Sequence, residues 1–274
     1  MNFDWNLLFA PFLAGLLVLS THVPLGRHVL GKGIIFIDLA VAQVAALGFM
    51  AAHGFSEAQG IESETTQALI SQLSAGGAAC AAALMLTWSG RRWPEIQEAL
   101  IGLLFVFSAC AGILLLAHDP HGGEHLKDLL AGQILWVNAG QLAIPALLYA
   151  ALLALWPWLQ RRFQEGGFYL VFALAVTVSV QLVGVFLVFT SLIVPALASR
   201  RLLGRAALVR GYSIGIVGYA AGLTASALWD LPAGPAIAAA LCLLALTGLG
   251  PAARSQQVGT AETGNAHPSG TVPR

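Results

Sequence analysis

Apolar residues form long runs along this chain, and polar residues collect in the short segments between the runs. Runs of about 18 or more residues with few charges are typical of helices that cross a lipid bilayer. We expect eight runs of this kind, near residues 6–26, 33–53, 68–89, 96–117, 139–159, 168–198, 208–228 and 234–250. The pattern therefore predicts an all-α fold, a polytopic bundle of transmembrane helices within residues 1–250.

The run over 168–198 is longer than the others and contains Gly184 and Pro195. Because a spanning helix takes about 20 residues, this run is too long for one straight crossing. We expect a broken helix there, or a crossing followed by a re-entrant piece. Thr190 and Ser191 add hydroxyl groups beside the proline, which fits either a pore lining or a bent structural helix.

Basic residues follow alternate runs, and Lys and Arg concentrate in the cytoplasmic loops of membrane proteins. Those after the first, third and fifth runs are Arg27 and Lys32, Arg91 and Arg92, and Arg161 and Arg162. These connections are predicted to be cytoplasmic, which places the N-terminus outside. The basic segment over 200–210 keeps the alternation only if 168–198 crosses twice or re-enters.

Composition excludes several classes of protein. The chain is 58% apolar and 9% charged, and thirteen Lys and Arg residues balance thirteen Asp and Glu residues. Soluble domains carry roughly 45–50% apolar and about 25% charged residues, so a soluble globular class is excluded. The neutral balance, without a basic stripe, excludes nucleic acid as a partner. After residue 250 the chain becomes polar, and we expect residues 251–274 to form a disordered tail.

No enzyme signature is present. The chain has no HExxH, GxSxG or GxxxxGK[ST] motif. We therefore expect that the protein is not an enzyme, and that any ATP that drives it is hydrolysed by another chain.

Asp38, in GIIFIDLAVAQVAALG, is the one acidic residue deep inside an apolar run. An ionisable group at that depth is costly and indicates a functional site that faces the bundle interior or a water-filled path. The alternative is a position nearer the interface, where the carboxylate reaches water or a loop amide. Gln43 lies about 140° around the helix from Asp38 and is expected to donate an interhelical hydrogen bond. Histidines near the predicted run ends, such as His22, receive no role.

A second group of possible metal ligands lies in AHDPHGGEHLKD, where His118, His121 and His125 are interleaved with Asp119 and Glu124. Imidazole and carboxylate groups suit zinc or manganese. The proline and glycines among them argue against a continuous helix. The segment is therefore either an outward-facing metal-collecting loop or a solvated turn.

Four glycines recur at helical spacing in GYSIGIVGYAAG: Gly211, Gly215, Gly218 and Gly222. Small residues at this spacing let helix backbones approach closely in lipid, so we expect a packing face there.

Three segments resemble the membrane-spanning permeases of zinc and manganese type ABC importers: VGVFLVFTSLIVPALASRRL around residue 184, SALWDLPAGPAI at 226–237 and DLLAGQILWVNAGQL at 128–142. The likeness covers most of residues 8–250. It implies a permease of a bacterial inner membrane that works as two copies with two ABC ATPase subunits and an extracytoplasmic metal-binding protein. Zinc or manganese would be the substrate, with no permanently bound cofactor.

The resemblance also implies site residues, with two departures. Asp38 falls on the family's Asp in G-D-x-x-S-H-A, whose Asp and His line the metal path, but the family's His is Ala42 here. From the residues themselves, we expect Gln43, Thr190 and Ser191 to lie along the same path. The connection after the fifth run is only RRFQEGG, without the family's acidic-x-x-x-Ala-x-x-x-Gly element that docks on the ATPase. The basic residues Arg200, Arg201 and Arg205 would then supply part of the ATPase contact.

Two alternatives remain open on the sequence. One is a stand-alone secondary carrier in which Asp38 exchanges protons against a substrate. The other is a non-transporting membrane scaffold derived from a permease, for which Asp38→Asn would be silent.

Overall fold

The computed structural model describes residues 6–61, 63–117 and 134–247, together with residues 123, 130 and 132. Within them the chain is helical and has no strand. Nine α-helices are described: α1 (Asn6–Lys32), α2 (Ile37–Ala58), α3 (Glu64–Arg92), α4 (Gln97–Leu115), α6 (Ala143–Phe163), α7 (Glu165–Val183), α8 (Val185–Ala198), α9 (Gly204–Trp229) and α10 (Ala233–Thr247). Three short 3-10 turns accompany them: η1 (Pro94–Ile96), η2 (Ile134–Trp136) and η3 (Ala139–Leu142).

Seven of the described helices are long and apolar enough to cross a membrane: α1, α2, α3, α4, α6, α7 and α9. The helices α8 and α10 are apolar but shorter. The predicted all-α polytopic bundle is confirmed. The histidines His118, His121 and His125, and the tail over 251–274, lie outside the described residues.

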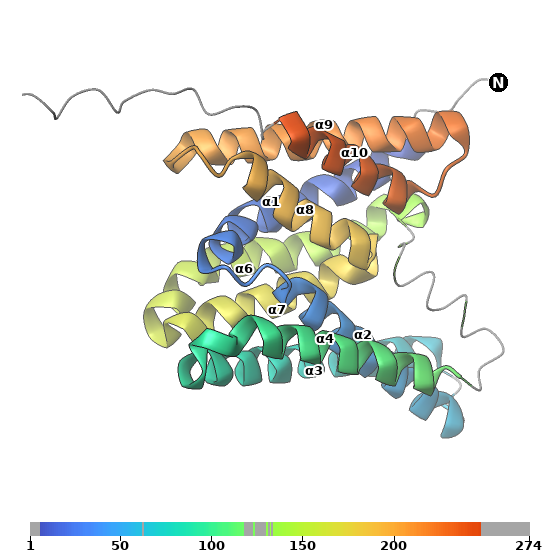
Figure 1. The fold of residues 1–274 in the computed structure, drawn as a ribbon. Coiled ribbons are helices and arrows are strands. Elements are labelled where there is room, and N and C mark those ends of the chain that lie inside the picture. The colour runs from blue at the N-terminus through green and yellow to red at the C-terminus, as the bar shows by residue number, and fades with distance from the viewer. Residues whose placement is uncertain are drawn as a thin grey trace, which may run out of the picture.

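The predicted break within 168–198 is also confirmed. The helix α7 ends at Val183, and Gly184 has a φ of 82° and a ψ of 162° before α8 begins. Glycine adopts a positive φ without the steric cost that a side chain brings, so it suits this corner. Beyond it the chain reverses, and α8 runs back across the bundle (Figure 1). Pro195 lies inside α8, which continues to Ala198.

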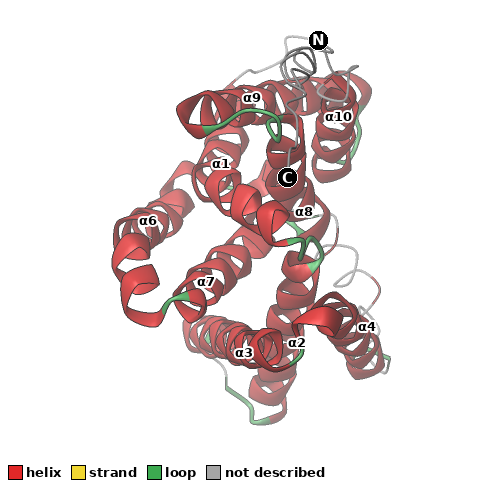
Figure 2. Ribbon diagram, turned by 60° about the vertical axis from the view of Figure 1, so that its left-hand side comes forward, coloured by secondary structure: helices red, strands yellow, loops and turns green. Residues whose placement is uncertain are grey.

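The helices form two groups on either side of α7, as Figure 2 shows. In one group α3 and α4 both pack against α2, and in the other α8 and α9 pack against α1 and α10. The helix α7 contacts members of both groups, including α1, α2 and α3. The core therefore lies around α7, α8 and the inner faces of α1 and α2.

The α9 glycines, Gly211, Gly215, Gly218 and Gly222, are all buried. A Cβ built on the first two would meet Val23 and Leu19 of α1, and one built on the last two would meet Leu241 and Ile237 of α10. The α9 glycines thus let α9 approach two helices at once, as their spacing predicts.

Candidate functional site

Asp38 lies in the first turn of α2, just after the connection that leaves α1. Its side chain is only 1% exposed, and neither carboxyl oxygen has a hydrogen-bond partner among the described residues. The amide groups of a first helical turn have no partners within the helix, and the positive end of the helix dipole favours a carboxylate there. A buried acidic group with unused oxygen atoms is available to bind a cation or a proton.

The start of α2 lies against α8. The Phe36 ring stacks on the Phe189 ring of α8, with 6.4 Å between centroids and 3° between planes. Ala42 follows Asp38 by one turn and is buried too, but its methyl group offers no ligand atom. The structure therefore brings the start of α2 next to the short helix that carries Thr190 and Ser191.

The other three path candidates are buried as well. The Thr190 hydroxyl donates to the Phe186 carbonyl oxygen of its own helix at 3.0 Å. The Ser191 and Tyr219 hydroxyls share a hydrogen bond of 2.9 Å that joins α8 to α9. Gln43 is 5% exposed, and the interhelical hydrogen bond expected of it is not formed among the described residues. Asp38 thus differs from Thr190 and Ser191, because neither of its side-chain oxygens has a hydrogen-bond partner among the described residues.

His22 is a candidate that the sequence analysis missed. The helix α1 continues to Lys32, so His22 lies well inside the helix and is fully buried. Its Nδ1 is 3.0 Å from the Val18 carbonyl oxygen, whereas Nε2 is buried without a partner in the described part of the chain. If Nδ1 donates to that carbonyl, Nε2 of the neutral ring carries a lone pair that can bind a cation. The sequence signal was only a histidine within a long apolar run, after Ser20 and Thr21 and before Val23.

The described residues contain no group of three or more His, Cys, Asp or Glu side chains that could hold a metal ion. Asp38 therefore cannot bind a metal with a complete set of side-chain ligands from this part of one chain. Backbone carbonyl oxygens, water or a second chain would have to complete the coordination.

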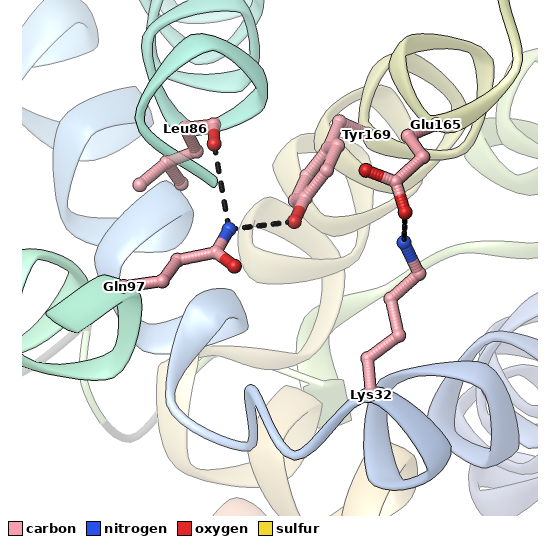
Figure 3. A network of polar contacts seen from close by, with 5 residues as sticks. All are labelled: Lys32, Leu86, Gln97, Glu165 and Tyr169. Carbon is pink, nitrogen blue, oxygen red and sulfur yellow. Dashed lines mark hydrogen bonds and ion pairs between the residues drawn. The ribbon is translucent and has the colours of Figure 1, made fainter. Parts of the chain in front are cut away.

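A polar network joins four helices at the end of the bundle where α1 ends and α7 begins, here called the Lys32 end (Figure 3). Lys32 Nζ is 2.6 Å from Glu165 Oε1, and lies 5.6 Å from the centroid of the Tyr169 ring. The Gln97 amide of α4 donates to the Tyr169 hydroxyl at 2.7 Å and lies 3.4 Å from the Leu86 carbonyl oxygen of α3. The network fixes the first turn of α7 relative to α1, α3 and α4.

Two connections at the Lys32 end are held closely. Gln164 alone separates α6 from α7, with a φ of 51°. The segment between α8 and α9 is held by Arg27, whose guanidinium donates to the Gly204 carbonyl oxygen at 3.2 Å, and by Arg210, which donates to the Ala198 carbonyl oxygen at 3.1 Å. Arg200 and Arg201 of this segment are exposed, as is Arg205 in the first turn of α9. The Lys32 end thus presents a short turn and a fixed basic segment.

Comparison with known proteins agrees with this architecture. The chain superposes on PsaBC from Streptococcus pneumoniae, solved in complex with Fab, with a TM-score of 0.69 and 18% sequence identity over 90% of this chain and 92% of that chain. At this identity the likeness shows a shared fold. The model of the ABC 3 transport family matches residues 4–166 and 158–250, which together cover nearly all of the bundle. With its polytopic helices and no enzyme motif of its own, the chain belongs to the ABC 3 transport family and is the membrane-spanning permease subunit of an ATP-binding cassette importer.

Proposed function

We propose that this permease imports a divalent metal ion, zinc or manganese. The observation that carries the proposal is Asp38, a buried carboxylic acid with two unpartnered oxygen atoms in a transport protein. Hard oxygen ligands suit manganese, and zinc accepts both carboxylate and imidazole. The metal is the substrate, and no permanently bound cofactor is needed.

The incomplete ligand set indicates how the ion is held in transit. Two copies of the chain would contribute one Asp38 each, and backbone carbonyl oxygens and water would complete the coordination. The unpartnered Nε2 of His22 is a further donor on α1, at a separate point in the bundle. A weak, partly hydrated site of this kind allows an ion to leave as readily as it enters, which a transporter requires.

The partners follow from this role. Two ABC ATPase subunits would bind at the Lys32 end, on the cytoplasmic side of a bacterial inner membrane, and an extracytoplasmic binding protein would deliver the metal to the other side. Because Gln164 is the whole α6–α7 connection, the exposed Arg200, Arg201 and Arg205 provide the larger contact. Arg27 of α1 and Arg210 of α9 form hydrogen bonds with the backbone at the two ends of that segment. A displacement of the segment by the ATPase would therefore be transmitted to α1 and α9.

The test is ATP-driven uptake of radioactive zinc or manganese into vesicles that hold the permease with its ATPase, with ATP inside and the metal-loaded binding protein outside. We expect Asp38→Asn to reduce uptake by more than tenfold, because the amide removes the charge that binds the cation. Glu95→Gln is the matched control, since Glu95 is exposed in η1, and it should leave uptake unchanged. Wild-type uptake by Asp38→Asn would reject the proposed site.

The same vesicles separate the competing functions. Uptake that does not depend on ATP and stops when the proton gradient is collapsed would indicate a secondary carrier. A tagged chain that co-purifies with an ABC ATPase near one-to-one, and loses it when Arg200 and Arg201 are changed to Glu, would support the proposed contact. Full recovery of the ATPase with that double variant would contradict it.

A further inference from the structure

An apolar groove lies between α3 and α4 near the Lys32 end. The two helices follow one another in the chain but touch little, because each packs against α2 (Figure 2). The space left between them is a groove of about 360 Å³. Its walls include Met85, Trp88 and Ser89 from α3, Trp93 from the connecting turn, and Leu103 and Phe107 from α4.

The groove begins at the junction of two candidate membrane spans and runs along both of them. The α3 span ends at Arg92 and the next span begins at Pro94, so Trp93 lies where the apolar segments meet water. Tryptophan and arginine side chains are favoured at that depth. Phe107 lies ten residues beyond Gln97, the first residue of α4, which is about 15 Å along the helix. The groove therefore has a polar mouth and an apolar body.

A cation that forms no ion pair within the described residues lies next to Trp93, which lines the groove. The Arg92 guanidinium carbon is 5.6 Å from the centroid of the Trp93 ring, which lines the groove. No acidic side chain in the described part of the chain forms an ion pair with Arg92. Inside the groove the Ser89 hydroxyl already donates to the Leu86 carbonyl oxygen. The body therefore offers hydrocarbon contact and the mouth offers one positive charge.

We propose that this groove is a binding site for an anionic phospholipid, with an acyl chain between α3 and α4 and the headgroup phosphate on Arg92. Guanidinium groups bind phosphate oxygen atoms in bidentate fashion, and a basic side chain at the membrane surface attracts anionic lipid. The apolar walls match a hydrocarbon chain and have no free polar group for a peptide or a soluble ligand. This proposal depends on the membrane location of the chain and is independent of the transported substrate.

A second cluster of one arginine and two aromatic rings lies outside the groove and provides a matched control for Arg92. At the end of α6, Arg162 lies 5.8 Å from the Phe163 ring, and that ring meets Trp158 edge to face with 6.4 Å between centroids. The Arg92 cluster has the same arrangement with Trp93 in place of Phe163, since Trp88 meets Trp93 edge to face at 5.0 Å. The α6 residues are not part of the α3–α4 groove. Arg162→Gln therefore removes the same charge and the same ring contact without touching the proposed site.

The experiment is native mass spectrometry of the purified chain in mild detergent with equal amounts of phosphatidylglycerol and phosphatidylcholine. We expect the wild type to retain phosphatidylglycerol preferentially. Arg92→Gln should lower its occupancy roughly fivefold, the effect of one interfacial basic residue. Leu103→Trp should lower the occupancy of both lipids, because Leu103 is 67% exposed and a larger side chain can fill the groove without entering the core. Arg162→Gln should bind lipid as the wild type does.

Three results would overturn the proposal. Equal retention of both lipids by the wild type would show that the headgroup charge is not recognised. An equal loss of phosphatidylglycerol in Arg162→Gln and Arg92→Gln would assign the effect to general surface charge. A wild-type dimer that Leu103→Trp converts to monomers would make the groove an interface between copies. Equal melting temperatures for the wild type and the variants verify that each comparison is made on folded protein.

Discussion

The helices α7 and α4 show how differently two membrane spans of similar composition can be used. The α4 span has a mean hydropathy of 2.3, yet only 17% of its most apolar window is buried. The α7 span has a mean hydropathy of 1.9, and 67% of its window is buried. Lipid tails are as apolar as leucine, so apolar character does not draw a helix inward in a membrane. The position of a helix in this bundle follows from small residues and buried hydrogen bonds.

The hydrogen bonds of the two helices agree with this reading. On α7, the Ser179 hydroxyl contacts the Tyr149 hydroxyl of α6 at 2.7 Å, whereas the hydrogen bond from Gln97 to Tyr169 involves only the first residue of α4. Beyond its first turn, α4 presents mainly large apolar side chains to the outside, among them Leu103 and Phe107. We therefore expect substitutions around α7 and α8 to destabilise the fold more than equivalent substitutions on α4.

The largest difference is expected between two glycines. A Cβ at Gly26 of α1 would collide with the Leu192 carbonyl oxygen of α8, whereas a Cβ at Gly102 of α4 would meet nothing within 4 Å. Gly26→Ala should lower the free energy of unfolding by about 3 kcal/mol, because two backbones must separate. Gly102→Ala should be neutral or stabilising by up to about 1 kcal/mol, since alanine favours helix. Unfolding in mixed micelles measures both, and equal losses would contradict the contrast.

A smaller effect is expected from one central hydrogen bond. Tyr219→Phe removes the hydroxyl that bonds Ser191 and should lower the free energy of unfolding by about 1 kcal/mol. The control is Thr224→Val, because the Thr224 hydroxyl is exposed and donates only to the Ala220 carbonyl oxygen of its own helix. Calorimetry in detergent gives both values. A Tyr219→Phe protein as stable as Thr224→Val would show that this hydrogen bond does not hold α8 to α9.

The smallest effect is expected at the Lys32–Glu165 ion pair, whose side chains are 24% and 53% exposed. Water screens such a pair, so a double-mutant cycle of Lys32→Met and Glu165→Gln should give a coupling energy of about 0.5 kcal/mol. The cycle is its own control, because each single variant removes one charge. A coupling energy above about 2 kcal/mol would show that the Lys32 end is as tightly held as the centre.

Much of the fold could be predicted because its signals are local. Apolar runs located the spans, and Gly184 located the break between α7 and α8 because one residue supplies the required φ. The spacing of the α9 glycines indicated a packing face for the same reason. Hydropathy could not rank the helices by burial, since it measures preference for lipid and protein interior alike.

The candidate site was less accessible to sequence reasoning. Asp38 stood out because a charge in an apolar run is costly wherever it lies. His22 did not, because its importance depends on whether a neighbour occupies Nε2, and the helix extends farther than the run predicted. The bond expected of Gln43 is not formed within the described part of the chain, and the ion pair of Lys32 joins residues 133 positions apart. Contacts between residues so far apart in the sequence cannot be recognised from the local pattern of apolar and polar residues.

The break at Gly184 also determines how the bilayer acts on the protein. With fourteen residues, α8 is about 21 Å long, and the hydrocarbon layer is about 30 Å thick. Most of α8 is buried among other helices, so this hydrophobic mismatch is not presented to lipid. Thicker or thinner membranes must instead tilt the outer helices α4 and α6. We therefore expect the short helix beside the start of α2 to be insulated from changes in bilayer thickness.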